Sequence, residues 1–194
     1  MEEVYAMPGY KLLDDRSQVK DSIVVDWDRG RKTFVPSTID NRNCTFTVDD
    51  VIVVVSHCWH DADGKLFNSL IRRHQSAPKN PDWPGNFQPG EAILWTDNQD
   101  PHDGPIRIKF QEPVSAAGAQ IQILDKGPFT AVLTVYDSTG QQVAELTHKG
   151  QSTSDGDDSA IFIGVEGPDI SCIEFETEDL SPTGLAINRL SIAS

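Results

Sequence analysis

In Pro105-Ile-Arg-Ile-Lys-Phe-Gln111, apolar and polar residues alternate from Ile106 onward. Successive side chains of an extended strand point to opposite faces, so Ile106, Ile108 and Phe110 share one face and two basic residues share the other. This alternation is typical of a half-buried β-strand. Ile121 and Ile123 oppose two glutamines in the same way, and the pattern continues to the end of the chain.

Runs of this kind recur from Gly90 onward and are separated by residues that favour turns, as in an all-β sandwich. Asp137-Ser-Thr-Gly140 predicts a tight hairpin in which Gly140 takes a positive φ. The expected strands are Ala92–Asp97, Pro105–Gln111, Gly118–Leu124, Phe129–Asp137, Gln142–His148, Ala160–Val165, Ile170–Thr177 and Leu185–Ile192.

Residues 1–89 are less regular and add N-terminal strands, one short helix and loops to the core strands at 90–194. Lys65–Gln75 predicts the helix, because its apolar residues fall on one stripe. We expect a single β-sandwich domain over 1–194, since the N-terminal strands need a partner sheet to bury their apolar faces. The N-terminal strands are expected at Ser22–Trp27, Thr33–Val35 and Cys44–Trp59, the last kinked at Asp49-Asp50.

The 194-residue chain has a net charge of −14, which argues against a nucleic-acid partner because phosphate neutralisation needs clustered lysine and arginine. No apolar run approaches the ~20 residues of a transmembrane helix, so no membrane span is expected. The first residues lack the basic and apolar regions of a signal peptide. The protein is therefore cytoplasmic, or it is secreted or displayed at the cell surface after removal of a leader.

Cysteine usage gives little guidance to function. The three cysteines form no CxxC pair, so zinc-ribbon and thioredoxin-type sites are not expected. Cys44 and Cys58 either pair across adjacent strands or remain buried thiols.

The connections between strands are unequal in charge. Strand direction reverses at each connection, so alternate connections gather at opposite ends of a sandwich. Aspartates concentrate at the end that collects residues 97–104, 125–128, 149–158 and 179–184. Calcium needs several oxygen ligands converging from flexible loops. The candidate ligands are Asp97, Asn98, Asp100 and Asp103, and the alternative is an acidic turn without an ion.

Other residues suit a bound ligand. Trp83 lies in a proline-rich loop, where its indole either stacks on a sugar ring or pins the loop to the sheet. Asn188 shares a face with Leu190 by alternation, so its amide must be hydrogen-bonded. It either ties down a neighbouring loop or contacts the ligand. The candidate ligand-binding residues are Trp83, Asp155, Asp157, Asp158 and Asn188.

Eight segments follow one another in an order that is familiar from a known family. They are Phe87–Leu94, Gly104–Phe110, Glu112–Val114, Gly118–Ile121, Phe129–Ala131, Val135–Gly140, Ser159–Gly164 and Ala186–Ser191. Together they resemble the jelly-roll β-sandwiches of bacterial exported proteins, many of which carry a PEP-type C-terminal sorting tail. These domains are similar in fold to galactose-binding-like carbohydrate-binding modules, so the resemblance implies an antiparallel, galactose-binding-like jelly-roll. Asn188 stands where such proteins often have an aspartate, which weakens the transfer of a metal ligand to this position.

We therefore expect a non-catalytic binding module for carbohydrate, with a structural calcium as an option. The sequence contains no GxSxG, HExxH, GxxxxGK[ST] or GxGxxG motif, which favours binding over catalysis. One alternative is a structural or protein-interaction domain of an exported bacterial protein, which would contact a cell-surface protein instead of a glycan. A further alternative is a glycan lyase or hydrolase on the same scaffold.

Overall fold

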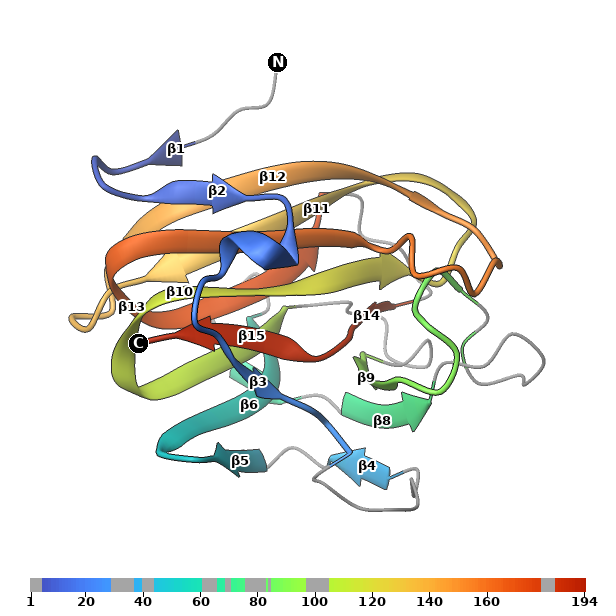
Figure 1. Cartoon of the computed structure of the whole chain (residues 1–194), viewed down its shortest axis with the longest axis horizontal. Coiled ribbons are helices and arrows are strands. Elements are labelled where there is room, and N and C mark those ends of the chain that lie inside the picture. The colour runs from blue at the N-terminus through green and yellow to red at the C-terminus, as the bar shows by residue number, and fades with distance from the viewer. Residues whose placement is uncertain are drawn as a thin grey trace.

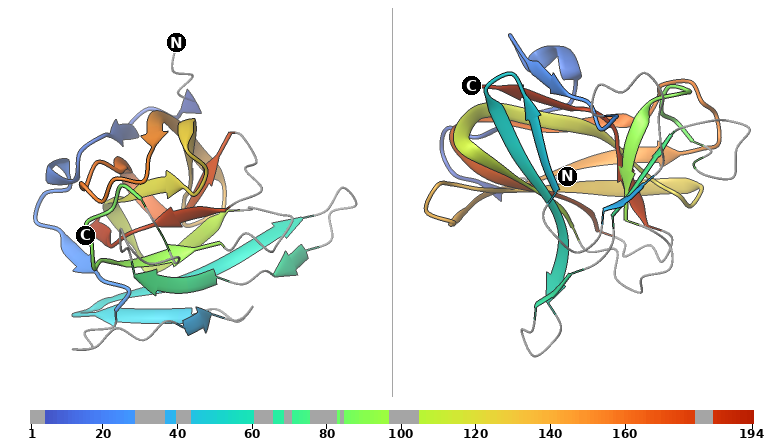
Figure 2. Two further views of the ribbon diagram at one scale, coloured as in Figure 1. Left: turned by 90° about the vertical axis from the view of Figure 1, so that its right-hand side faces the viewer. Right: turned by 90° about the horizontal axis from the view of Figure 1, so that it is seen from below.

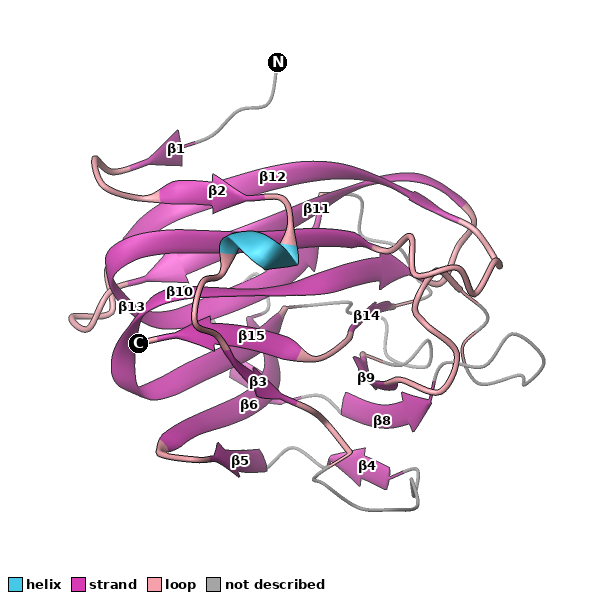
Figure 3. Ribbon diagram, in the orientation of Figure 1, coloured by secondary structure: helices cyan, strands magenta, loops and turns pink. Residues whose placement is uncertain are grey.

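The computed structural model describes residues 5–28, 37–39, 44–60, 66–68, 71–75, 83, 85–96, 105–178 and 184–194 (Figure 1). The described part is all-β, and its helical element is one short 3-10 turn (Figure 3). The elements are β1 (Tyr5–Ala6), β2 (Lys11–Leu13), η1 (Arg16–Gln18), β3 (Ile23–Val25), β4 (Ser37–Ile39), β5 (Cys44–Val48), β6 (Val51–His60), β7 (Leu66–Asn68), β8 (Ile71–Gln75), β9 (Ala92–Trp95), β10 (Ile106–Ile123), β11 (Gly127–Tyr136), β12 (Gln142–Ser152), β13 (Ile161–Thr177), β14 (Leu185–Ile187) and β15 (Leu190–Ala193).

β10 and β13 are the two longest strands, and they pair with each other antiparallel along most of their length. The register shifts twice between Lys109 and Ala116, where β10 bends. β13 bends beside it, so both strands pass from one layer of the sandwich into the other (Figure 2). The expected connections at Glu112–Ala117 and Gly167–Asp169 are therefore bent strand segments and not loops.

The two layers share these bent strands. The centre of layer A consists of β2, the first half of β13, the second half of β10, and then β14 and β15, which both pair with β10. On one side, β3 pairs with β15. On the other side, β9 pairs with β14, and β8 and β4 follow. Layer B consists of β1, β12, β11, the second half of β13, the first half of β10, β6 and β5. The antiparallel β-sandwich expected from the sequence is thus present.

The apolar faces predicted by alternation meet between the layers. Ile108 and Ile173 from layer B and Ile121 and Ile192 from layer A belong to one buried cluster, each with no exposed surface. Removing this apolar area from water is the main favourable contribution to folding. Trp27 is fully buried at the margin of the same core, where its ring meets Phe46 edge-on at 5.0 Å.

The prediction of a helix at Lys65–Gln75 is wrong. The chain forms β7 and β8 there, and β8 pairs with β9 so that Arg72 lies opposite Trp95. Sheet pairing overrides the helical spacing of the apolar residues, because helix propensity is a weak preference that tertiary contacts outweigh. Gly140 does take a positive φ of 84° in the hairpin between β11 and β12.

The single strand expected at Cys44–Trp59 is instead a hairpin. Asp49 has a φ of 51° and begins a two-residue turn, after which β6 pairs back on β5. The register places Cys44 opposite Val55 and Cys58 opposite Asn68, so these two cysteines are not cross-strand neighbours. The strand expected at Thr33–Val35 lies outside the described residues.

Glu176 lies on the outer face of layer B beside other carboxylates. Burial raises the pKa of Glu176 above its ordinary value, and the charges of Glu174 and Glu145 raise it further. The folded protein therefore disfavours the ionised form of this side chain. The protonated side chain therefore favours the folded state at low pH. This contribution to stability is lost as the pH rises from the pKa of Glu176 in the unfolded chain through its higher pKa in the folded protein.

We predict that Glu176→Gln raises the free energy of unfolding at neutral pH, because it removes a partly buried charge that lies near Glu174 and Glu145. Near about pH 3, where the glutamate is protonated in both states, the substitution should change little. Urea denaturation at the two pH values measures the difference. An equal effect of the substitution at both pH values would contradict the prediction.

Candidate functional site

Two segments cover the outer face of layer A. The N-terminal segment that carries η1 buries Val19 against Phe162. In the second segment, Trp83 and Phe87 are buried against β9 and Ala160. A groove of about 380 Å³ lies beside the N-terminal segment, which contributes Asp14, Asp15 and Arg16 to its lining. Its lining is mostly polar: Asp14, Asp15, Arg16, Gln120, His148, Asp158, Ser159, Ala160, Ile161, Phe162 and Arg189.

Local capping positions Arg16 over the groove. Asp15 begins η1 and accepts a hydrogen bond from the backbone N–H of Ser17 at 2.7 Å, while Gln18 accepts from the backbone N–H groups of Asp14 and Asp15. These reciprocal bonds satisfy N–H groups at the start of the turn, as in a capping box. The chain is thereby held where the Arg16 side chain reaches β15.

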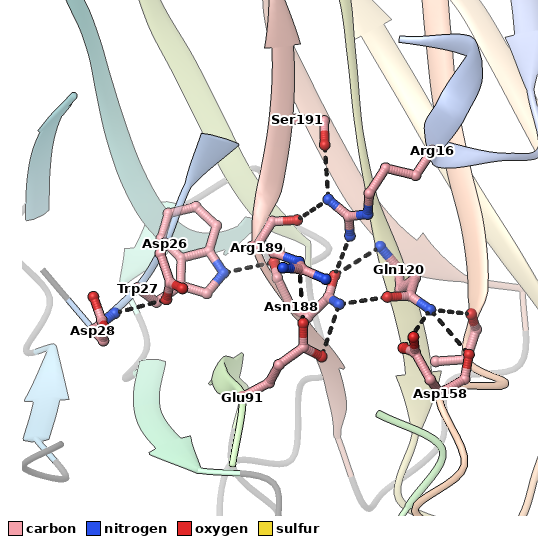
Figure 4. A network of polar contacts seen from close by, with 11 residues as sticks. Arg16, Asp26, Trp27, Asp28, Glu91, Gln120, Asp158, Asn188, Arg189 and Ser191 are labelled. Atoms are coloured by element: carbon pink, nitrogen blue, oxygen red, sulfur yellow. Dashed lines mark hydrogen bonds and ion pairs between the residues drawn. The ribbon is translucent and has the colours of Figure 1, made fainter. Parts of the chain in front are cut away.

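The Arg16 guanidinium is held on several sides (Figure 4). It donates to the carbonyl oxygen of Arg189 at 3.0 Å and to Ser191 Oγ at 2.7 Å, and its carbon lies 5.4 Å from the centre of the Phe162 ring. Burial lowers the pKa of Arg16, and the nearby charge of Arg189 lowers it further. Arginine nevertheless keeps its proton in proteins, so Arg16 remains a cationic donor.

Asn188 lies at the centre of this network and is fully buried. Its Oδ1 accepts from Arg16 at 2.8 Å and from the backbone N–H of Gln120 at 3.0 Å. Its Nδ2 donates to Glu91 Oε2 at 3.1 Å and to Gln120 Oε1 at 2.5 Å (Figure 4). The backbone carbonyl accepts from Trp27 Nε1 at 2.6 Å. The amide is hydrogen-bonded as expected, and protein partners occupy both of its ends, which favours the alternative in which Asn188 ties neighbouring segments together.

The three aspartates of the loop before β13 differ in what they can contact. Asp157 accepts from the backbone and hydroxyl of Ser159, and Asp155 accepts from Thr153. Asp158 lines the groove, where its Oδ1 accepts from Gln120 Nε2 at 3.2 Å. Asp158 therefore stays a candidate ligand-binding residue, whereas Asp155 and Asp157 lie outside the groove lining.

Trp83 does not present a stacking surface for a sugar ring. The side chain is fully buried, and its Nε1 donates to Gln122 Oε1 at 3.2 Å. Gln122 donates in turn to Asn86 and Ser152, and Gly85 leaves space in which the Gln122 carboxamide fits. The alternative in which Trp83 pins its loop to the sheet is the one that the structure supports.

Of the four connections predicted at the acidic end, the structure describes those at 125–128 and 149–158. Asn86 donates to Thr153 and Ser159, and Ser152 donates to the carbonyl of Ile123, so these loops meet at one end. The candidate calcium ligands Asp97, Asn98, Asp100 and Asp103 lie outside the described residues. Within the described ranges, no three His, Cys, Asp or Glu side chains converge as a metal site would require.

The sequence analysis did not identify Arg16, Gln120 and Arg189, which line the groove, as candidate site residues. Gln120 occupies a position that alternation assigns to solvent, and its sequence neighbours do not indicate which chain segment crosses over it. Arg189 lies in the short connection between β14 and β15, 3.1 Å from Glu91. The capping pattern around Asp15 is the one local signal that could have located the turn that carries Arg16.

Comparison with known proteins supports the fold. No family model and no curated protein matches the chain. Among solved structures, a DUF4465 family protein from Bacteroides caccae is similar, with a TM-score of 0.51 and 12% sequence identity. The match covers 90% of this chain and 100% of that one. At this identity the likeness concerns the fold alone. Among the described residues, no helix has the length and hydropathy to cross a membrane.

We predict that Asn188→Ala destabilises the protein by about 3 kcal/mol, because it leaves Arg16, Glu91 and Gln120 with unsatisfied groups at a buried position. Urea denaturation measures the loss. The exposed Asp155→Asn is the control and should change stability by no more than about 0.5 kcal/mol. A loss no larger than that of the control would show that the network is not required for stability.

Proposed function

We propose that the protein is a non-catalytic module that binds a neutral, hydroxyl-rich ligand, such as a glycan, in the groove on layer A. One observation carries the proposal: the groove combines hydrogen-bond donors and acceptors that a buried network holds in place. Arg16 offers N–H groups, Asp158 and Ser159 offer oxygens, and Gln120 holds Asp158 in place. A sugar hydroxyl both donates and accepts, so it can bridge such neighbours.

The charge of the groove favours a neutral ligand. Arg16 and Arg189 contribute two positive charges, and Glu91 neutralises Arg189 by an ion pair at 3.1 Å. Asp14, Asp15 and Asp158 add negative charge to the lining, in a chain that is already strongly acidic. Electrostatic repulsion would therefore disfavour a polyanion, while uncharged hydroxyl groups would not be repelled.

The fixed positions of these side chains also support binding. Gln120 donates to the carbonyl of Ala160 at 2.9 Å as well as to Asp158, and its carboxamide oxygen is held by Asn188. A preorganised group loses little conformational freedom when a ligand arrives, so more of its interaction energy appears as affinity. A secreted or cell-surface location would bring such a groove to extracellular glycans, and we include that location in the proposal.

Binding of neutral oligosaccharides tests the proposal. We expect a glycan array to identify ligands, and calorimetry then measures their affinity. Asp158→Asn should weaken this affinity about tenfold, because the groove loses a charged hydrogen-bond acceptor. Asparagine tolerates the φ of 62° at this position and retains an oxygen for Gln120.

Asp155→Asn is the matched control, because it changes the same charge on the same loop outside the groove lining. The affinity of this variant for the glycan should stay within about twofold of that of the unaltered protein, because substitutions of exposed residues have small effects. Retention of no glycan, or equal affinity of the two variants, would contradict the proposal.

A structural calcium in the loop at 97–103 remains a separate prediction, based on its four oxygen-bearing side chains. Calcium that binds only the folded protein should raise the melting temperature on the order of 5 °C at roughly hundredfold excess over Kd. Thermal denaturation in calcium and in EDTA measures this shift, and the double variant Asp97→Asn, Asp100→Asn should lose it. Equal melting temperatures of the unaltered protein in the two buffers would exclude the site.

A further inference from the structure

We infer that the groove on layer A is one half of a longer site, a conclusion that rests on the proposed function. The whole site binds a linear, neutral oligosaccharide of several sugar residues, which is a narrower class of ligand than any hydroxyl-rich molecule. The other half is a pocket of about 490 Å³ on the same outer face, called the second pocket below. It shares no lining residue with the groove, but η1 contributes a residue to each.

Strand register builds the floor of the second pocket. Lys11 of β2 lies opposite Glu166 of β13. Glu166 lies opposite Ala116 of β10, which in turn lies opposite Ala193 of β15. These residues form one row across four paired strands, and all of them line the pocket. The ladder fixes the positions of residues in such a row, so the floor is in place before a ligand arrives.

The floor of the groove is another row, further along the same strands. Gln120 of β10 lies opposite Phe162 of β13, and both line the groove. Ala116 and Gln120 are four positions apart on β10 and therefore lie on the same face. A strand rises about 3.4 Å per residue, so the two rows are separated by roughly 14 Å. A single sugar ring is too short to reach both rows, whereas a chain of several rings can reach them.

The row between these two floors is covered by η1. In this row Leu13 lies opposite Gly164, and Gly164 lies opposite Gly118. A Cβ atom on Gly118 would come 2.5 Å from Phe162 Cζ, so a side chain there would displace that ring. Leu13, Phe162 and Val19 are buried in one cluster, and η1 lies in front of β13 and β10 (Figure 1). A chain that occupies both halves therefore has to cross the outer side of η1.

The outer side of η1 is polar. Ser17 and Gln18 are exposed, and the Gln18 carboxamide oxygen accepts from the backbone N–H groups of Asp14 and Asp15. The nitrogen of the same carboxamide can then donate to a ligand hydroxyl. A 3-10 turn advances about 2 Å per residue, so Arg16 in the groove and Gln18 in the second pocket are separated by one narrow ridge.

The second pocket combines apolar and polar groups that suit a sugar ring. Ala116 and Ala193 are small apolar residues of its floor, and they leave room above the sheet for the C–H groups of a ring to pack. Lys11 and Lys20 supply N–H donors, and Glu166 supplies a carboxylate acceptor. A ring in this pocket would therefore meet an apolar floor and polar neighbours together.

Charge in the second pocket is mixed, as it is in the groove. Lys11 lies opposite Glu166, and Lys20 is followed by Asp21, which also lines the pocket. An anionic chain would meet carboxylates in both halves of the site, whereas uncharged hydroxyl groups would not be repelled. A neutral chain is therefore the ligand that fits both halves.

Affinity as a function of chain length tests the inference. The probes are cello-, manno- and xylo-oligosaccharides, which are linear and neutral, from the disaccharide to the hexasaccharide. Calorimetry measures their affinity for the full chain. In at least one series the hexasaccharide should bind at least about tenfold more tightly than the disaccharide, because only the longer chain gains contacts in the second pocket.

Two variants of the second pocket should reduce this gain with chain length. Glu166→Gln removes a charged acceptor at an exposed position, and Ala193→Leu fills space above the floor without changing the charge. In each variant the ratio of hexasaccharide to disaccharide affinity should fall about five- to tenfold. Glu178→Gln is the matched control, because this exposed carboxylate follows β13 and lies outside both linings. The control should keep the full gain, and melting temperatures show whether each variant is folded.

The outcomes separate this inference from the proposed function. Equal affinity of disaccharide and hexasaccharide, or a full gain with chain length in Glu166→Gln, would overturn the inference. A loss of affinity in Asp158→Asn would still support the proposed function in that case. If none of the probes binds, the inference is also wrong, and retention of no glycan on the array would overturn both. If Ala193→Leu does not fold, Glu166→Gln alone decides.

Discussion

The pairing of β10 with β13 is the constraint on which the rest of the sandwich depends. Both strands remain hydrogen-bonded to each other while they bend from one layer to the other, so they form one side of the sandwich without a loop. Ile108 and Ile121 face the same core from opposite layers although they belong to one strand. Every other described strand joins this pair directly or through a neighbour.

The bent pair also determines where polar groups are buried. Its second half supplies Gln120 and Gln122 to the outer face of layer A, and two chain segments then cover that face. Covering a carboxamide is costly unless its hydrogen bonds are replaced, which Asn86 does for Gln122 and Asn188 does for Gln120. The rigidity of the groove follows from this requirement, because every member of the network must be satisfied together.

Alternation was enough to predict the core faces of the strands, because burial on one face imposes a period of two on the sequence. Helical spacing misled the prediction at Lys65–Gln75, where β8 pairs with β9 instead. Alternation did not reveal that Gln122 is buried, because a segment distant in sequence covers this outward-facing residue. The groove depends on contacts of this second kind. Arg16 and Asn188 are 172 residues apart, and no local pattern encodes their meeting.

The groove on layer A depends on particular side chains, because each buried carboxamide of its network needs a specific partner. Substituting Asn188 or Gln120 would therefore disturb the groove even in a chain that keeps the same fold. The core between the layers tolerates exchange among apolar residues of similar volume, whereas a covered amide left without a partner is costly. The groove is thus more specific to this sequence than the sandwich that carries it.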